Sequence, residues 1–157
     1  MIKFVISQNI LAICTIIDLK DDRLMLITME CDYAIRTIRA LAGGEKLSVA
    51  TICAAEHIPS QYAYKILKKL QHAGFVESHR GCDGGYILIK PLDEFTLYDV
   101  VSALGKNLYL IECLTPGHSC ARNSNEAPCS VHCELRRIHD MMISELASKT
   151  MMNVLNS

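Results

Sequence analysis

The fold of this chain is decided by residues 50–81, ATICAAEHIPSQYAYKILKKLQHAGFVESHRG. Two short amphipathic helices flank His57-Ile58-Pro59, because a residue that precedes proline is disfavoured in the helical conformation. We expect Ser60 to be the N-cap of the second helix and Gly74 to follow its end. Between them, apolar residues recur at the spacing of one buried helix face: Ala63, Ile66, Leu67 and Leu70. The pattern predicts a helix-turn-helix.

The second helix has a polar and basic outward face. Its residues are Gln61, Lys65, Lys68 and His72, with Tyr62 and Lys69 beside them. Residues 57–80 hold four basic residues against one acidic residue, a local charge of +3, whereas the whole chain has a formal charge of −1. Lysines neutralise phosphates, and glutamine or serine can exchange hydrogen bonds with base edges. These residues alone favour two interpretations about equally: a surface that binds DNA, and a basic helix face that is only exposed to solvent.

Two strand-like runs, residues 75–80 and 86–90, follow the helix-turn-helix. The glycine-rich segment 81–85 joins them, and glycine allows a backbone to approach another surface closely. Arg80, before this tip, is placed to enter a minor groove. Helix, turn, basic helix and hairpin is the order of a winged helix, although a hairpin that only packs on the helices is an alternative.

Further amphipathic helices flank this unit. Residues 32–42 have helical periodicity, and we expect Asp32 to be their N-cap. Thr96 and Asp99 form a capping-box pair in front of a helix that Gly105 ends. A last helix over about 133–150 carries an apolar stripe: Leu135, Ile138, Met141, Met142 and Leu146. Because a loop separates this stripe from the winged helix, it favours pairing with a second chain as well as core packing.

The composition bounds the domain organisation. The chain has 157 residues, of which 50% are hydrophobic, and this excludes intrinsic disorder. No run approaches the roughly 20 apolar residues of a membrane span, so we expect a cytoplasmic protein with no membrane partner. The patterns predict an extension of unknown role over 1–24, a winged helix-turn-helix over 25–105, a cysteine-rich loop over 106–133, and a helix and tail over 134–157. Residues 1–24 match a signal peptide poorly.

Four of the eight cysteines gather in one loop: Cys113, Cys120, Cys129 and Cys133. A loop this long is uncommon in a compact domain unless it has a function. Thiolates select zinc, copper(I) or iron–sulfur centres, and the absence of paired C-x2-C motifs makes zinc less favoured. The loop therefore predicts a site for a soft metal or a cluster.

The same cysteines allow other interpretations. They would form disulfides in a secreted protein, or a redox switch without metal. One of them would be a catalytic nucleophile beside His118 or His132, but a crowded loop singles out none, so we expect no enzymatic activity. A small metal–thiolate redox protein, with an incidental basic helix, is a further alternative.

Three segments resemble a known family: DYAIRTIRALA (32–42), residues 50–81, and GGYILIKPLDEFTLYDVV (84–101). They are similar to the winged-helix family of bacterial iron–sulfur and nitric-oxide-sensing transcription regulators, which includes IscR and NsrR. The resemblance covers about residues 29–150. It implies a mainly α fold with a small β-hairpin, and a homodimer formed by a long C-terminal helix. It also implies binding to double-stranded operator DNA and a 2Fe–2S cluster in the loop before that helix.

The resemblance also implies roles for individual residues. DNA contacts are expected from Ser60, Gln61, Tyr62, Lys65, Arg80 and Gly81, to which the basic face adds Lys68 and Lys69. Cluster ligands are expected among Cys113, Cys120, Cys129 and Cys133. The family usually has three cysteines, so two alternates remain: His132, and Asp32 at the position of an acidic ligand from the other chain. The expected function is a DNA-binding repressor that senses iron–sulfur status, nitric oxide or redox state, with a cluster-free thiol switch as the alternative.

Overall fold

The structure of this chain is a computed structural model that describes residues 27–81, 83–105, 108–120, 122–123 and 127–156. Its elements are α2 (Met29–Leu41), α3 (Val49–Glu56), α4 (Ser60–His72), β1 (Val76–His79), β2 (Gly85–Leu88), α5 (Leu97–Ala103), the 3-10 helix η2 (Glu112–Leu114), α6 (Ser130–Ser148) and α7 (Met151–Leu155). The predicted fold class, mainly α with a small β-hairpin, is confirmed. Among the described helices, none has the length and apolar character that a membrane crossing requires. The expected extension, residues 1–24, lies outside the described ranges.

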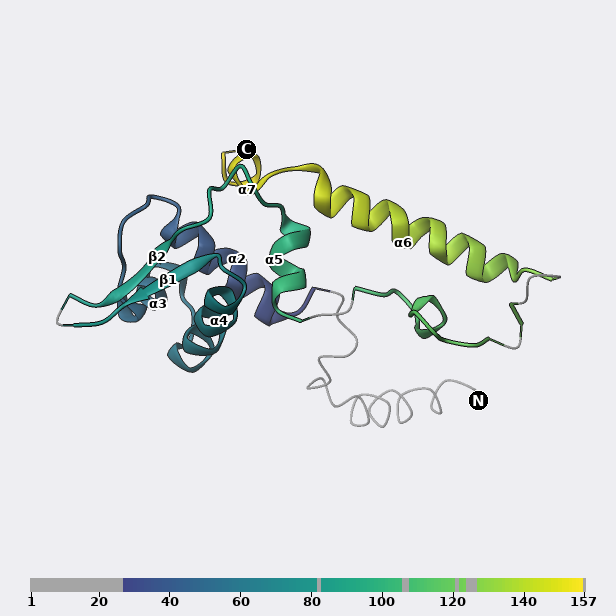
Figure 1. Ribbon diagram of the computed structural model, residues 1–157, viewed down its shortest axis with the longest axis horizontal. Coiled ribbons are helices and arrows are strands. Elements are labelled where there is room, and N and C mark those ends of the chain that lie inside the picture. The colour runs from purple at the N-terminus through teal and green to yellow at the C-terminus, as the bar shows by residue number, and fades with distance from the viewer. Residues whose placement is uncertain (1–26, 82, 106–107, 121, 124–126, 157) are drawn as a thin grey trace, which may run out of the picture.

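Helices α3 and α4 form the predicted helix-turn-helix and pack against α2 (Figure 1). Ser48 caps α3, because its hydroxyl accepts a hydrogen bond of 3.1 Å from the Thr51 amide. The helix ends at Glu56, and its C-cap His57 has a left-handed φ of 53°, which redirects the chain toward α4. The four residues of the predicted α4 stripe are fully buried, which confirms the predicted core face.

Two predicted N-caps are wrong. Helix α2 begins at Met29 with Thr28 as its N-cap, because the first turn buries Glu30 and Cys31 and extends the helix upstream of the visible periodicity. Asp32 therefore lies inside α2, where it forms an ion pair of 2.8 Å with Arg36. At α4, Pro59 occupies the N-cap position with an extended backbone, and Ser60 is the first helical residue.

The wing consists of β1 and β2, which pair antiparallel with Val76 opposite Leu88. Leu47 extends it, because Leu47 and Tyr86 exchange two backbone hydrogen bonds of 2.9 and 2.8 Å. The sequence did not predict this pairing, since Leu47 stands outside any strand-like run. Gly85 lies so close to this contact that an added Cβ would be 2.5 Å from the Leu47 carbonyl oxygen. The wing is thus attached to the chain segment that enters α3.

Gly85→Ala is expected to destabilise the fold by about 1–3 kcal/mol, because the new methyl group collides with backbone that cannot move away cheaply. Gly43→Ala is the matched control, since a Cβ at Gly43 meets no atom within 4 Å. Urea unfolding followed by circular dichroism measures both variants. Equal stability of the two variants would contradict the role given to the Leu47–Tyr86 contact.

Helices α5 and α7 close the core. The predicted capping box of α5 is confirmed, because the Thr96 amide donates to Asp99 Oδ2 at 2.8 Å and Thr96 Oγ1 accepts from the Asp99 amide at 3.3 Å. The predicted last helix does not reach residue 150: it ends at Ser148, and Lys149 has an extended backbone. Helix α7 follows and returns to the core, where the fully buried Met151 donates its amide to the Phe95 carbonyl at 2.8 Å.

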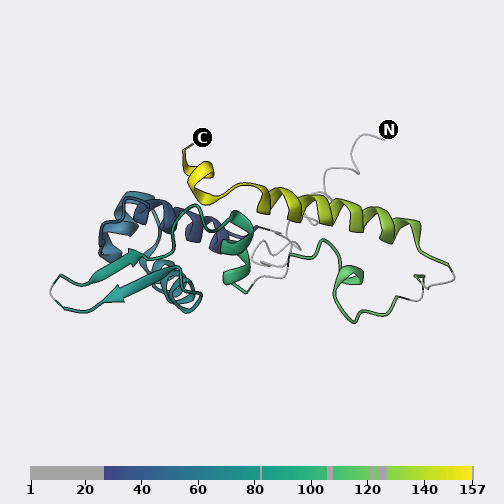
Figure 2. The same ribbon diagram turned by 45° about the horizontal axis from the view of Figure 1, so that its top comes forward.

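Helix α6 extends from the winged-helix body as an arm, and the segment around η2 runs beside it (Figures 1 and 2). It begins at Ser130, before the start that the sequence predicts. Near its C-terminal end, Met142, Ile143 and Leu146 pack on the core cluster. Farther along the arm, Val131, Ile138 and Met141 are 64%, 41% and 58% exposed. The helix thus presents an apolar surface that no described residue covers.

Candidate functional site

A groove of about 660 Å³ lies between the start of α3, the outward side of α4 and the wing. Tyr64 of α4 lines it and is 60% exposed. Arg80 and Gly81 contribute the wing side, and Ser48 contributes the start of α3. Sequence reasoning missed Tyr64, although its place on α4, away from the core stripe, was a usable signal. The groove combines a cation, an exposed aromatic ring and a helix N-terminus, which are groups that contact nucleic-acid backbones and bases.

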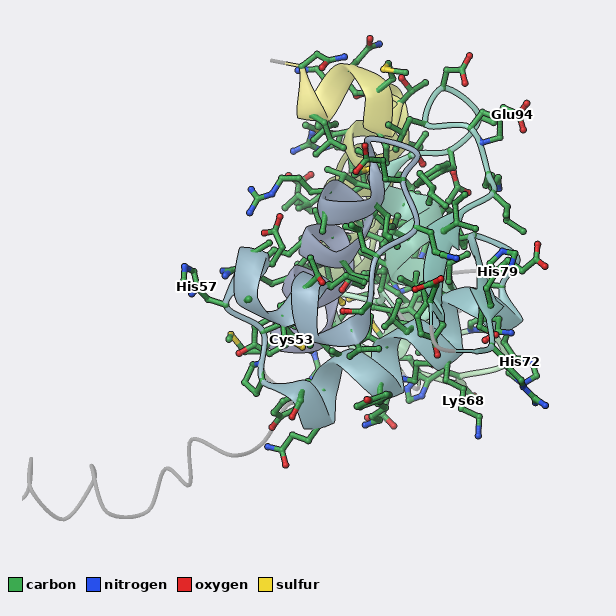
Figure 3. The ribbon with its side chains drawn as sticks, turned by 90° about the vertical axis from the view of Figure 1, so that its left-hand side faces the viewer. Cys53, His57, Lys68, His72, His79 and Glu94 are labelled. Atoms are coloured by element: carbon green, nitrogen blue, oxygen red, sulfur yellow. The ribbon has the colours of Figure 1, made fainter. Side chains whose placement is uncertain are left out.

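The structure exposes most of the residues that were expected to contact DNA: Ser60, Gln61, Tyr62, Lys65, Lys68, Arg80 and Gly81. The Tyr62 ring lies 5.6 Å from the Tyr33 ring of α2, which orients it at the start of α4. Lys68 and His72 point outward from α4, on the opposite side of the view from Cys53 and His57 (Figure 3). Gln71 of α4 donates to the Ser78 hydroxyl of β1 at 3.1 Å, so the exposed side of α4 adjoins the wing.

Lys69 is placed differently from the other lysines of α4. Its Nζ lies 2.8 Å from the carboxylate of the buried Glu30 and donates to the Leu104 carbonyl at 3.0 Å. The ammonium group thereby connects α2, α4 and α5. We infer that Lys69 positions α4. Lys65 also approaches Glu30, at 3.8 Å, but its side chain stays 64% exposed, and Lys68 is exposed as well.

A second ionic cluster holds α3 on α2, directly behind the helix-turn-helix. Glu56 is 8% exposed and accepts a hydrogen bond of 3.0 Å from Arg39 Nε, with a further contact from Arg39 Nη2. This hydrogen bond, with the Glu56 charge, raises the pKa of Arg39. Arg36 also donates to the Glu56 carbonyl at 3.4 Å, just before the turn at His57. The cluster fixes the point from which α4 starts.

The cysteine loop and α6 enclose a cavity of about 620 Å³, which we call the thiol cavity. Cys113 and Cys120 line it, together with His118 and His132. Cys113 is carried by η2 and His132 by the first turn of α6, and the Cys113 Sγ and His132 Nδ1 atoms are 3.4 Å apart. Side chains that are 19 residues apart in sequence therefore meet because η2 lies beside α6.

Arg136 determines which tautomer of a neutral His132 ring fits its hydrogen bonds, and this ring is only 8% exposed. The Arg136 Nε and Nη2 atoms lie 3.3 and 3.0 Å from His132 Nε2. Arginine has only donors, so Nε2 is the acceptor, and a neutral imidazole carries its proton on Nδ1. His132 Nδ1 then donates to the Cys113 sulfur. Sequence reasoning missed Arg136, which lies one helical turn after His132.

The other two cysteines of the loop do not line the thiol cavity. Cys129 is the N-cap residue of α6 and donates its amide to Asn123 Oδ1 at 3.0 Å. Cys133 lies one turn farther on and is exposed. Within the described ranges, no three His, Cys, Asp or Glu side chains are grouped closely enough to bind one metal ion. Ligation by four cysteines would therefore require the loop and the start of α6 to close together.

The donor set of the thiol cavity suits a thiolate-bound metal group. Two thiols and three imidazoles, of His118, His132 and His139, are donors for soft and borderline metals. Arg136 and Asp140 also line the cavity, and the Arg136 charge would balance anionic thiolates. Cys129 and Cys133, at the first turn of α6, are the remaining soft donors of the loop. The residues present thus fit an iron–sulfur cluster in chemistry, although the described atoms do not form a closed ligand set.

Comparison with known proteins identifies relatives of the chain. The model of the Rrf2 family, described as an iron-dependent transcriptional regulator, matches residues 27–157. The chain is 33% identical over 115 residues to the HTH-type transcriptional regulator NsrR of Geobacillus kaustophilus, covering 71% of this chain and 74% of that protein. It is 38% identical over 95 residues to protein aau3 of Rhizobium meliloti, covering 59% of this chain and 62% of that protein. The match thus spans less than two thirds of the length of aau3.

Solved structures share the fold. CymR, the global cysteine regulator of B. subtilis, superposes with a TM-score of 0.66 and 24% identity, covering 83% of this chain and 95% of that chain. IscR of T. potens superposes with a TM-score of 0.62 and 20% identity, covering 85% and 88% of the two chains. These similarities confirm the winged-helix fold.

Proposed function

The chain belongs to the Rrf2 family of transcriptional regulators, and we propose that it is a DNA-binding repressor whose operator affinity is controlled through its cysteine loop. The observation that carries DNA binding is the exposed polar side of α4, which adjoins the wing across a groove. Lys65 and Lys68 lie on the exposed side of α4, and Arg80 lies across the groove from Tyr64. A major groove accepts such a helix, and a wing arginine suits an adjacent minor groove.

The proposed active unit is a homodimer on double-stranded operator DNA. The exposed apolar residues of α6 are the surface that a second copy would cover. A two-fold dimer places two recognition helices on successive half-sites of one DNA face. Such a repressor acts on the chromosome, so we propose a cytoplasmic location and no enzymatic activity.

The proposed cofactor is a 2Fe–2S cluster held by Cys113, Cys120, Cys129 and Cys133. Such a cluster supplies a centre that can be oxidised, nitrosylated or lost. Cys113 and Cys120 already line the thiol cavity, which supports their assignment. His132 also lines it and is the alternate ligand closest to these thiols. Asp32, the other alternate, forms its ion pair with Arg36 in α2.

The proposed coupling follows from where the thiols are attached. Two come from the loop, and two come from the first turn of the arm, so that shared ligation would fix the loop against α6. Fixing the base of the dimerisation helix would set the separation of the two recognition helices. Loss of the cluster would release this constraint and lower operator affinity.

A cluster-free thiol switch is the second candidate function. The observation in its favour is the 3.4 Å contact between His132 Nδ1 and Cys113 Sγ, which requires no metal. In that case, oxidation of Cys113 would alter the loop directly. The two functions differ in iron and acid-labile sulfide content, which only the cluster protein contains.

DNA binding is tested through its dependence on salt. We expect affinity for duplex DNA to fall steeply with salt concentration, and Lys68→Gln to reduce the slope of log affinity against log salt by about 1, because one phosphate contact is lost. Lys149→Gln, an exposed lysine between α6 and α7, is the matched control and should leave the slope unchanged. Fluorescence anisotropy measures all three proteins. Salt-independent binding, or equal slopes for Lys68→Gln and the wild type, would contradict the proposed interface.

A further inference from the structure

A separate cavity of about 510 Å³, which we call the α4–α5 cavity, lies between the second half of α4 and the end of α5. Lys65, Lys68 and His72 of α4 line one wall of it. Ala103 and Leu104, at the end of α5, supply an apolar lining on the other side, and Ala73, which directly follows α4, adds to it. Figure 3 shows Lys68 and His72 on the same edge of α4, both pointing away from the protein body. The cavity thus combines a cationic wall with an apolar one.

The electrostatic balance of this cavity is positive. The carboxylate of Glu30 lies 2.8 Å from Lys69 Nζ and 3.8 Å from Lys65 Nζ, so one acidic group faces two lysines there. Lys68 adds a third ammonium group to the lining. Lys69 also donates to the Leu104 carbonyl, which satisfies a carbonyl at the end of α5 that would otherwise repel an anion. An anion in this cavity would therefore meet an excess of positive charge.

The apolar lining narrows the choice of anion. A DNA phosphate needs cations and hydrogen-bond donors, but gains nothing from Ala73, Ala103 and Leu104. An organic anion uses both parts, because its charged group pairs with the lysines while its apolar body contacts the alanines, Leu104 and the methylene stems of the lysines. We propose that the α4–α5 cavity binds a small organic anion: a carboxylate, sulfonate or phosphate ester with an apolar body.

We further propose that an organic anion in the α4–α5 cavity competes with DNA. This competition, unlike anion binding itself, rests on the proposed function. Lys65 and Lys68 line the α4–α5 cavity and also belong to the exposed side of α4 that we assign to DNA. A ligand that neutralises them removes phosphate contacts from the recognition helix. The cavity would thus admit an effector that weakens DNA binding independently of the cysteine loop.

The site is tested with 2-naphthoate as the probe and uncharged 2-naphthalenemethanol as its counterpart. Titration of the full chain, followed by 1H–15N correlation spectra, should shift amides of residues 65–73 and 103–105 saturably. Naphthoate should bind about tenfold more tightly than the alcohol, a difference that corresponds to one favourable ion pair of about 1.4 kcal/mol. Lys68→Gln should remove most of this advantage, whereas Lys149→Gln, outside the cavity, should not.

A second variant separates the apolar contribution. Ala73→Leu fills the cavity from an exposed position and keeps every lysine, so it should abolish saturable binding of naphthoate while the circular dichroism spectrum stays that of the wild type. Scattered shifts without saturation, equal binding of acid and alcohol, or equal losses in Lys68→Gln and Lys149→Gln would overturn the site. If inorganic phosphate binds as tightly as naphthoate, the organic-anion assignment is overturned, and the cavity is a binding site for inorganic phosphate.

Competition is measured on a labelled random-sequence duplex at low salt. Naphthoate should lower the DNA affinity of the wild-type protein several-fold and leave that of Ala73→Leu unchanged. Binding of naphthoate without an effect on DNA affinity would overturn the competition and leave the anion site intact. Failure of DNA binding under every condition would instead refute the proposed function, because naphthoate binding is measured without DNA.

Discussion

Cys113→Ser, in protein purified without oxygen, is expected to lose the visible absorbance of the proposed cluster together with its iron and acid-labile sulfide. Cys113 lines the thiol cavity and its Sγ lies 3.4 Å from His132 Nδ1, so its sulfur already faces the site that we propose for the cluster. A serine hydroxyl is a poor ligand for this group, because soft thiolates are what iron–sulfur centres select. We expect the iron content to fall to about a tenth or less, and operator affinity to fall with it.

Cys53→Ser is the matched control for this experiment. Cys53 lies in α3, outside the cysteine loop, and is neither fully buried nor part of the thiol cavity. It should leave absorbance, iron and DNA affinity unchanged. If Cys113→Ser retained full iron and sulfide, Cys113 would not be a ligand, and the assignment would move to the remaining thiols of the loop.

Ile138→Lys is expected to convert the proposed dimer into a monomer. Ile138 is 41% exposed on α6, between the exposed Val131 and Met141, and a buried charge at the centre of a helix pair is costly. We expect the dimer dissociation constant to rise at least about thirtyfold, as it does for a central interface residue. DNA affinity should fall by about a hundredfold or more, because two linked half-sites bind far more tightly than one.

Ser144→Lys places the same charge at an exposed polar position of α6 and should leave the dimer intact. Sedimentation velocity gives the oligomeric state of both variants, and circular dichroism reports whether α6 still forms. A dimeric Ile138→Lys protein would show that the apolar side of α6 is not the interface. A monomeric wild-type protein would contradict the dimer itself.

Local periodicity predicted the central part of the fold. The α4 stripe from Ala63 to Leu70, the glycine after that helix and the capping box at Thr96 depend on neighbouring residues, so the sequence contains them directly. The sequence placed the start of α2 too late, at Asp32, because the first turn of the helix buries Glu30. A glutamate is expected to be exposed unless a partner such as Lys69 is known. The partner lies in another helix, and periodicity within one helix cannot reveal it.

Contacts between distant segments were beyond prediction for the same reason. Leu47 becomes part of the wing only because Tyr86 pairs with it, and α7 forms a separate helix where Met151 bonds to Phe95. At the candidate site, the sequence identified the thiols but not which side chains lie close to them. The meeting of Cys113 with His132, and the role of Arg136, depend on η2 lying beside α6, which spacing along the chain does not specify.

The central claim is that the cysteine loop holds a cluster that controls DNA affinity. Its most direct test is the operator affinity of one anaerobic preparation, measured before and after the iron is removed by chelation, with iron and sulfide determined in both states. We predict two irons and two sulfides per chain before chelation, and a loss of operator affinity of at least about tenfold afterwards, corresponding to a coupling energy of roughly 1.4 kcal/mol. Equal affinity of the two forms, or a preparation without iron and sulfide that already binds operator fully, would contradict the account.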